Sequence, residues 1–315
     1  MRIVIIGAGM SGLIAARMLH EANHDVVILD KGRGPGGRMA TRRIGEAVFD
    51  HGAQYFTTQT TWFQGLVHAW AELGVVCPWF SGDHPEHVRW RGTQSMNAIT
   101  KHLASGLDVR LATTVTSVDI RNDDVRTQLV EGHEVVGDVC IITAPLPQTR
   151  ILLDGCIEKL SSEHRHLLDE EAYDPCFAVM ATLTASPEIA TSGPLMLNDH
   201  PSIALITENM SKGISTTPCV TIHSTPEFAR RQWEHDRTQT MQALLEAAAP
   251  YLSSAVVDAQ IHGWKYARPT IVPLAPYICA SDSPLVLIAG DAFGGPRIEG
   301  AALSGRAAAN HILSL

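Results

Sequence analysis

The chain has no closely spaced cysteines. Its six cysteines are Cys77, Cys140, Cys156, Cys176, Cys219 and Cys279, and no two of them form a C-x-x-C pair. This spacing excludes a thioredoxin-like redox motif and the common zinc motifs. A chain of 315 residues is also large enough to fold without disulfide bonds. We therefore expect reduced thiols, a cytoplasmic location and no bound metal.

The chain also lacks a positive net charge and a long apolar run. Its formal charge is −9 and its pI is about 5.9, which argues against nucleic acid or anionic lipid as general partners. A local basic pocket for an anionic ligand stays possible. No stretch reaches the 18 or so uninterrupted apolar residues of a membrane span. The N-terminal apolar run superficially resembles a signal peptide, but its regularly spaced glycines favour a folded strand and turn.

The first thirty residues have the pattern of a dinucleotide-binding unit. A β-branched run at 2–6 predicts a buried parallel strand, and a helix and a second strand follow it. Gly7, Gly9 and Gly12 form G-x-G-x-x-G between strand and helix, a turn that lets backbone amides approach a diphosphate. Asp30 ends the second strand, where a carboxylate can accept hydrogen bonds from a ribose.

Later segments favour FAD over NAD as the dinucleotide. Gly37 follows Gly36 in a glycine-rich loop, and Arg38 and Met39 come next. Such a loop can pass close to the diphosphate, with the arginine as a charged contact. Near the C-terminus, Gly290-Asp291 ends a strand at 285–289, which places a carboxylate for the ribityl chain. A small-residue helix at 300–315, preceded by Glu299 and including Ala301, can direct its positive N-terminus at the flavin.

The overall pattern predicts an α/β protein with two interleaved domains. Strands are expected at 107–111, 115–120, 125–130 and 135–143, and a helix begins at Thr225-Pro226 and continues through Leu245. We predict a Rossmann-type FAD-binding domain with a parallel sheet, and a substrate domain with a mixed sheet of α+β type. The predicted ranges are 1–60, 95–150 and 270–315 for the FAD-binding domain, and 61–94 and 151–269 for the substrate domain.

One strand-like segment is a candidate wall of the substrate pocket. Trp264, Tyr266 and Arg268 alternate and therefore share one face of a strand. They can form an aromatic wall with an arginine for an anionic ligand; equally, the two rings can be core and the arginine can pair with a local acid. Arg230, Arg231 and Arg237 could contact a dinucleotide phosphate, although a solvated helix face is the favoured interpretation. We find no certain catalytic residue.

Several motifs resemble those of the renalase-like flavin oxidoreductases of bacteria, within the wider amine-oxidase-type FAD fold, also related to p-hydroxybenzoate hydroxylase. The motifs cover the framework and leave 150–260 unmatched. They are Gly7–Gly12, Asp30–Arg33 with Gly36–Met39, Asp50–Thr57 (DHGAQYFT), Val88–Gly92 (VRWRG), Met96 with Ala98–Thr100, Trp264–Pro269 (WKYARP), Gly290-Asp291, and Arg297–Ala301 with Ser304-Gly305.

This resemblance implies non-covalent FAD and an oxidase activity. The substrates would be misformed 2- or 6-dihydro isomers of NAD(P)H, which lose hydride to the flavin and give NAD(P)⁺; O2 would then reoxidise the flavin and give H2O2. By carry-over, the residues expected at FAD are Met10, Ser11, Asp30, Lys31, Arg38, Gly52, Ala53, Gln54, Val115 and Asp291. Those expected at the floor of the substrate site are Tyr55, Phe56 and Thr57. The sequence leaves the oligomeric state open.

Three other functions fit the same framework. A flavin amine oxidase would need a neutral amine and usually an aromatic cage beside the flavin. A related desaturase or dehydrogenase of a lipophilic substrate would usually need membrane access, for which no basic amphipathic helix is evident. A binding module without catalysis would hold FAD or NAD without accepting hydride.

Overall fold

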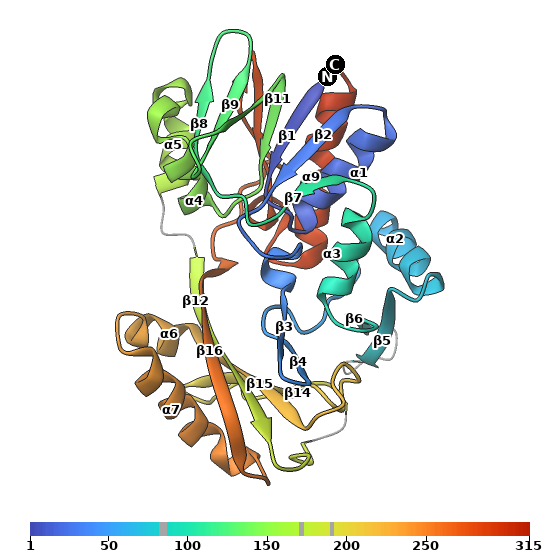
Figure 1. Cartoon of the computed structure of the whole chain (residues 1–315), viewed down its shortest axis with the longest axis vertical. Coiled ribbons are helices and arrows are strands. Elements are labelled where there is room, and N and C mark those ends of the chain that lie inside the picture. Colours follow the sequence, from blue (N-terminus) through green and yellow to red (C-terminus); the bar gives the residue numbers. More distant parts are fainter. Residues whose placement is uncertain (82–86, 170–172, 190–191) are drawn as a thin grey trace. The chain divides into compact units, whose positions relative to one another are not determined.

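The chain forms two compact units that alternate along the sequence. The computed structural model describes residues 1–81, 87–169, 173–189 and 192–315 (Figure 1). The first unit consists of Met1–Gly37, Thr100–Ala172 and Pro269–Leu315, and the second of Arg38–Ile99 and Tyr173–Arg268. The predicted interleaving of two α/β domains is therefore present.

The unit boundaries differ from the predicted ranges at 38–60, 95–99, 151–172 and 269. Residues 38–60, which we assigned to the FAD-binding domain, belong to the second unit, and residues up to Ala172 belong to the first. The hairpin of β3 (Thr41–Ile44) and β4 (Ala47–Asp50) explains the first difference. Phe49 of β4 is buried against Met180 and Cys219 of the second unit's sheet. The predicted substrate-domain ranges also include 82–86, 170–172 and 190–191, which lie outside the described residues.

A six-stranded sheet forms the centre of the first unit. Its order is β17-β18-β11-β1-β2-β7. The strands are β1 (Arg2–Ile6), β2 (Asp25–Leu29), β7 (Asp108–Arg110), β11 (Val139–Ile142), β17 (Ile278–Asp282) and β18 (Leu285–Ile288). All neighbours pair in parallel except β17, which is antiparallel to β18. The β-branched residues of β1 are buried on both faces of this sheet, as parallel strands require.

The two faces of this sheet carry different layers. On one face, α1 (Met10–Glu21) packs against α9 (Ile298–Leu313). On the other face lie β8 (Val115–Ile120), β9 (Val125–Leu129) and β10 (Glu134–Gly137), an antiparallel meander. Its Val135 is buried against Val4 and Val27 of the central sheet. The parallel sheet therefore has both apolar faces covered.

The single strand that we predicted at 135–143 is two strands in different sheets. β10 ends at Gly137 and β11 begins at Val139. Asp138 lies between them and is held by two bonds to Arg2, whose amide donates to the Asp138 carboxylate and whose carbonyl accepts from its amide. The apolar run continues across this break, so periodicity alone could not reveal it.

A five-stranded sheet forms the centre of the second unit. Its order is β13-β14-β15-β12-β16, with antiparallel pairing from β13 through to β12. The strands are β12 (Tyr173–Leu183), β13 (Leu195–Met196), β14 (Ile203–Glu208), β15 (Cys219–Ser224) and β16 (Val256–Pro269). One face is buried in a core with Phe228 and Leu244 of two helices, and the other face carries the β3–β4 hairpin.

The helix that we predicted from Thr225 to Leu245 is two helices. Thr225 caps α6 (Pro226–Gln232) by accepting a hydrogen bond from the Phe228 amide, as predicted. Asp236 then caps α7 (Arg237–Ala248) through the Gln239 amide. The second cap begins a new helix after the break at 233–236, and this second N-cap signal was missed.

The remaining elements lie outside the two large sheets. They are α2 (Thr61–Glu72), β5 (Val76–Ser81), β6 (Val88–Gly92), α3 (Asn97–Ala104), α4 (Leu146–Leu152), α5 (Ser162–Asp169), α8 (Asp291–Gly294) and 3-10 turns at Gly37–Met39, Asp154–Lys159 and Ala249–Tyr251. Within the described ranges, no helix is both long and apolar enough to cross a membrane.

Candidate functional site

The three glycines of the first turn have different structural roles. Gly7 has φ +110°, and a Cβ there would lie 2.5 Å from the Thr143 hydroxyl; a Cβ at Gly12 would lie 2.1 Å from the Gly7 carbonyl oxygen. The fold itself therefore requires glycine at both positions. At Gly9, φ is −83°, and a Cβ would meet no protein atom within 4 Å. Close approach of a ligand explains the glycine at this position better than packing does.

The first turn of α1 offers further groups to a phosphate. Met10, Ser11 and Gly12 begin the helix, and their amides precede the first intrahelical bond, which Leu13 donates to Gly9. The Ser11 hydroxyl is buried and has no hydrogen-bond partner among the described residues. A buried, unpaired hydroxyl is costly in a finished interior. Both features fit a bound diphosphate at this turn.

The Asp30 carboxylate holds the backbone of this turn. One oxygen accepts from the Ala8 amide and the other from the Gly32 amide, each at 2.6 Å. A carboxylate has about four acceptor sites, so capacity for a ribose hydroxyl remains. The neighbouring Lys31, predicted at FAD, donates to the Gln148 side chain at 3.2 Å. Val115, also predicted there, begins β8 and packs on the apolar cluster around Val4.

The C-terminal motif brings a strand end against two helices. Gly290 has φ +151°, and its amide donates to the Ser304 hydroxyl of α9 at 2.8 Å. Asp291 follows as the first residue of α8 and is 9% exposed. Glu299 is buried in the first turn of α9, and Ala301 is half-buried one residue after the close contact of Gly300 with Gly294. The first unit thus holds Asp291 at the end of β18, as the FAD prediction requires.

The second unit brings several predicted cofactor residues together. The Ala53 amide donates to the Arg38 carbonyl at 2.9 Å, and a Cβ at Gly52 would lie 2.0 Å from that oxygen. The Arg38 guanidinium approaches the carbonyls of Tyr266 and Ala267, each at 3.4 Å. Gly37, the last residue of the first unit, has φ +51°, and Met39 is buried.

A buried ion pair, which was not predicted from the sequence, holds the Gln54 side chain in place. The Lys212 ammonium donates to Asp50 at 2.8 Å and to the Gln54 amide oxygen at 3.2 Å. The Gln54 amide nitrogen donates to the carbonyls of Asp50 and Gly52. The Lys212 and Asp50 side chains are fully buried. Burial lowers the pKa of Lys212, and Asp50 opposes that shift. This network fixes the segment that carries Gln54.

Tyr55, Phe56 and Thr57, which follow Gln54, lie in different environments. The Phe56 ring is buried against Phe63, and its backbone pairs with Trp90. Phe56 is therefore part of the core of its unit. Tyr55 is half-buried and lies edge-on to Phe80 at 5.2 Å between ring centres. Thr57 is half-buried as well.

The predicted wall on β16 is a face of aromatic rings that ends in an arginine. Trp264 donates its indole N–H to the His51 carbonyl at 2.7 Å and stacks on the His51 ring with 5.3 Å between centres. Tyr266 lies edge-on to Tyr173 at 5.6 Å. Arg268 pairs with the Asp174 carboxylate at 2.7 Å. The local acid of the alternative interpretation is therefore present, although the Arg268 side chain remains 62% exposed.

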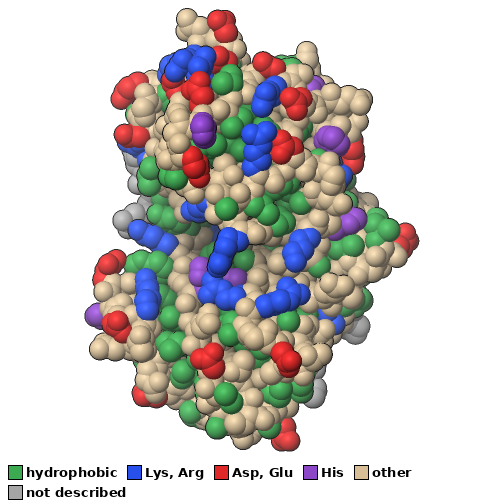
Figure 2. Space-filling view, in the orientation of Figure 1, with side chains coloured by type: hydrophobic (Ala, Val, Ile, Leu, Met, Phe, Trp, Pro, Cys, Tyr) green, Lys and Arg blue, Asp and Glu red, His purple; other side chains and the backbone are tan. Residues whose placement is uncertain are grey.

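Three histidines line this face, and sequence reasoning did not group them. His262 contacts Trp264 with 4.3 Å between ring centres, and His223 makes a hydrogen bond to the His51 carbonyl. Burial, assisted by His262 and Arg42, lowers the pKa of His51 to about 3. Burial also lowers the pKa of His223 to about 4. Both rings are thus neutral at pH 7. Figure 2 shows the Lys, Arg and His side chains that reach the surface on the side of the molecule turned to the viewer.

These histidines make stability depend on pH. Their folded-state pKa lies below the ordinary value of 6.5, so the unfolded chain binds protons first as the pH falls. Their contribution to the free energy of unfolding is therefore complete above pH 6.5. It decreases as the pH falls toward 4 for His223 and toward 3 for His51, with a slope of up to about 1.4 kcal/mol per pH unit for each histidine. Urea unfolding between pH 4.5 and 7.5 should give a flatter profile for His223→Gln than for the unmodified protein. Parallel profiles would contradict this account.

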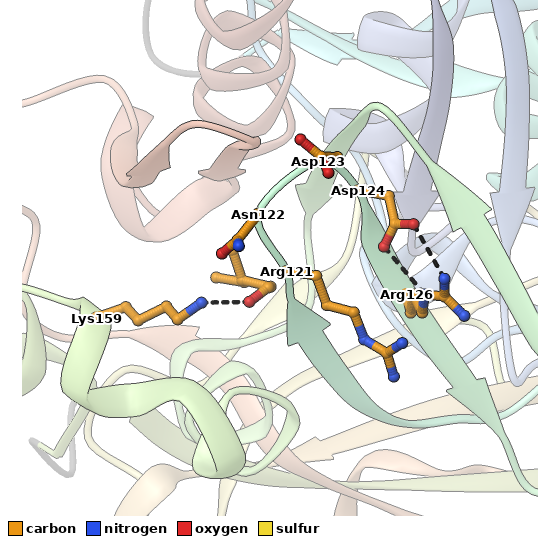
Figure 3. Close-up of a pocket in the computed structure, with 7 residues that line it drawn as sticks. Arg121, Asn122, Asp123, Asp124, Arg126 and Lys159 are labelled. Atoms are coloured by element: carbon orange, nitrogen blue, oxygen red, sulfur yellow. Dashed lines mark hydrogen bonds and ion pairs between the residues drawn. The ribbon is translucent and has the colours of Figure 1, made fainter.

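One open hollow of the first unit is lined by none of the predicted site residues. Across the described ranges, no three His, Cys, Asp or Glu side chains are grouped as metal ligands. An open hollow of about 460 Å³ lies at the β8–β9 turn. Figure 3 shows the residues that line it, among them Asn122 and Asp123. Two of its cations already have partners: Arg126 donates to the Asp124 carboxylate and Lys159 to the Ile120 carbonyl. None of the predicted site residues lies there.

Comparison with known proteins agrees with this organisation. The family model of the flavin containing amine oxidoreductases matches residues 80–313, and that of the NAD(P)-binding Rossmann-like domain matches residues 5–70. Renalase of Mus musculus is 25% identical over 297 residues, which cover 85% of each chain.

Solved structures share the fold at low identity. Reduced UDP-galactopyranose mutase matches with a TM-score of 0.77 and 14% identity over 99% of this chain and 95% of that chain. A triple variant of putrescine oxidase matches with a TM-score of 0.73 and 15% identity over 99% of this chain and 98% of that chain.

The comparisons confirm the predicted fold and the predicted FAD cofactor. The features of the first unit fit that cofactor independently, because the space beside Gly9 is open and the buried Ser11 hydroxyl has no hydrogen-bond partner among the described residues. The predicted likeness to renalase also holds over most of the chain. Since the family match spans residues 80–313, the chain belongs to the flavin containing amine oxidoreductase family.

Proposed function

We propose that this chain is an oxidase of isomeric dihydronicotinamide dinucleotides. The substrates are the 2- or 6-dihydro forms of NAD(P)H, the product is NAD(P)⁺, and O2 is the final acceptor, which yields H2O2. FAD, held non-covalently, supplies the hydride-accepting group. The observation that carries the proposal is the β16 face, where the Trp264 ring stacks on His51 and Arg268 follows four residues later on the same face.

The chemistry of a dihydropyridine suits this face. The lone pair on the ring nitrogen drives hydride departure, so no protein base has to remove a proton. The protein then has to orient a planar ring with the reacting atoms about 3–3.5 Å apart. Trp264 offers a stacking surface, and its indole N–H is already bonded to the His51 carbonyl, which fixes the ring.

The neutral histidines are consistent with a mechanism that needs no base. With pKa values of about 3 for His51 and about 4 for His223, neither titrates near neutrality. An amine substrate is protonated at pH 7 and has to lose a proton before oxidation. The limiting rate of flavin reduction by a dihydronicotinamide should therefore be independent of pH above about 5, whereas reduction by an amine should accelerate with rising pH.

Amine oxidation is the second candidate. The family is described by that chemistry, and a putrescine oxidase shares the fold. The Trp264–His51 stack of this chain could also contact an amine.

A comparison of electron donors separates the two candidates. In anaerobic stopped-flow experiments, the purified flavoprotein is mixed with 2-dihydro-NAD, 6-dihydro-NAD, ordinary NADH or a primary amine, and the loss of the flavin band near 450 nm is followed. We expect rapid bleaching by the 2- or 6-dihydro isomer and much slower bleaching by the others. Rapid bleaching by amines alone would favour the second candidate and refute the first.

A further inference from the structure

Asp174 holds two arginines from different elements of the second unit. It is the second residue of β12, and its side chain is 7% exposed. One carboxylate oxygen accepts from Nε and Nη2 of Arg268, at 3.2 and 2.7 Å. The other oxygen accepts from Nη2 of Arg230 on α6. A buried carboxylate with these bonds fixes the planes of both guanidinium groups.

The two arginines keep unused hydrogen-bonding capacity and positive charge. Their side chains are 51% and 62% exposed for Arg230 and Arg268. Each guanidinium has five N–H donors, and the bonds to Asp174 use only part of them. The further partner of Arg230 is Glu227, 3.6 Å away and 67% exposed, a surface pair of small energetic value. Arg230, Arg268 and Asp174 together carry a net charge of +1 before the exposed Glu227 carboxylate is counted.

Arg268 continues the aromatic face of β16, and Asp174 also holds Arg230 of α6. Arg268, Tyr266 and Trp264 alternate along the strand, so their side chains share one face and span about 13 Å. Tyr266 is paired with Tyr173, the residue before Asp174. The arrangement is a row of stacking rings followed by two oriented guanidinium groups. A ligand with an aromatic ring linked to a phosphate group matches this order.

We propose that Arg230 and Arg268, oriented by Asp174, bind the diphosphate of the dinucleotide substrate. This inference rests on the proposed function and adds a recognition site for the part of the substrate that does not react. The Arg231 side chain, exposed on the same helix, has no part in this site. The favoured interpretation of Arg230 as a residue of a solvated helix face is thereby revised, whereas Arg237 stacks on Phe177 and Trp233.

The test compares a dinucleotide with a substrate that lacks phosphate. Stopped-flow reduction is measured with the dihydronicotinamide dinucleotide and with the corresponding dihydronicotinamide riboside, for Arg230→Gln, Arg268→Lys and the control Arg231→Gln. Either site variant should raise the apparent Kd for the dinucleotide about tenfold, the effect of losing a hydrogen bond to a charged group. The Kd for the riboside, the limiting rates and the Arg231→Gln values should not change. Equal effects on both substrates, or on Arg231→Gln, would overturn the inference.

A second measurement separates this inference from the proposed function. ADP-ribose carries the diphosphate but donates no hydride, and its binding to the flavoprotein can be followed by calorimetry. Binding that weakens in Arg230→Gln and Arg268→Lys but not in Arg231→Gln supports the diphosphate site even if no dihydronicotinamide reduces the flavin. Failure of the unmodified protein to bind ADP-ribose refutes the site, whatever the donor experiments give.

Discussion

Gly9→Val should give a folded protein that contains no flavin. A Cβ at Gly9 would meet no protein atom within 4 Å, and φ there is −83°, which valine can adopt. The added methyl groups would instead occupy the space that the diphosphate needs above the turn. We expect flavin occupancy below about a tenth of the unmodified protein, measured by absorbance near 450 nm, because valine blocks the close approach that glycine permits.

Two comparisons separate loss of cofactor from loss of fold. The Tm of Gly9→Val should equal that of the unmodified apoprotein, since bound FAD itself stabilises the fold. Gly155→Val, at another position where a Cβ meets nothing within 4 Å, should keep its flavin. Gly12→Val should instead misfold, because its Cβ would clash with the Gly7 carbonyl at 2.1 Å. Full flavin occupancy in Gly9→Val would refute the assignment of the phosphate site.

Among the proposed substitutions that keep the volume of the side chain, Lys212→Met should lower the free energy of unfolding most. It removes the ammonium from a fully buried pair and leaves the Asp50 carboxylate in the interior. Breaking a buried pair from one side typically costs about 3–5 kcal/mol. Thr41 and the Met96 amide still donate to Asp50, at 2.6 and 3.0 Å, so we expect a value near the lower end of this range. Urea unfolding at pH 7 measures it.

A second substitution identifies the cause of this loss. Asp50→Asn removes the charge that Lys212 compensates, so Asp50→Asn/Lys212→Met should recover part of the stability lost in Lys212→Met. The Lys212 ammonium also donates to Gln54, so weaker FAD retention should accompany the single variant. A change in unfolding free energy below about 1 kcal/mol, which is typical of exposed pairs, would show that the buried pair is not what holds this segment.

The segments whose structure could be predicted from the sequence are those in which neighbouring residues carry the signal. Gly7 and Gly12 lie in one strand-helix-strand unit and have the close contacts that their spacing indicates. The contact of Asp30 with a ribose stays a prediction. The last helix was expected at 300–315 and occupies Ile298–Leu313. In these segments the hydrophobic period, the turn residues and the strand ends all indicate the same structure.

The missed features depend on residues far apart in the chain. Lys212 meets Asp50 across 162 positions, and His223 meets His51 across 172. No local pattern marks either pair, and a lone lysine or histidine in a sequence usually lies on the surface. The same holds for Asp174, which pairs with Arg268 from 94 positions away. The unit boundary near residue 38 was missed because the β3–β4 hairpin packs on strands that follow much later.

The most direct test of the proposed oxidation is an anaerobic titration of the purified flavoprotein with the 2- and 6-dihydro isomers of NAD(P)H. We predict that one equivalent of NAD(P)⁺ forms for each flavin bleached, and that admission of air restores the 450 nm band with one equivalent of H2O2. A flavin that stays oxidised with every isomer, or that bleaches without formation of NAD(P)⁺, would contradict the assignment.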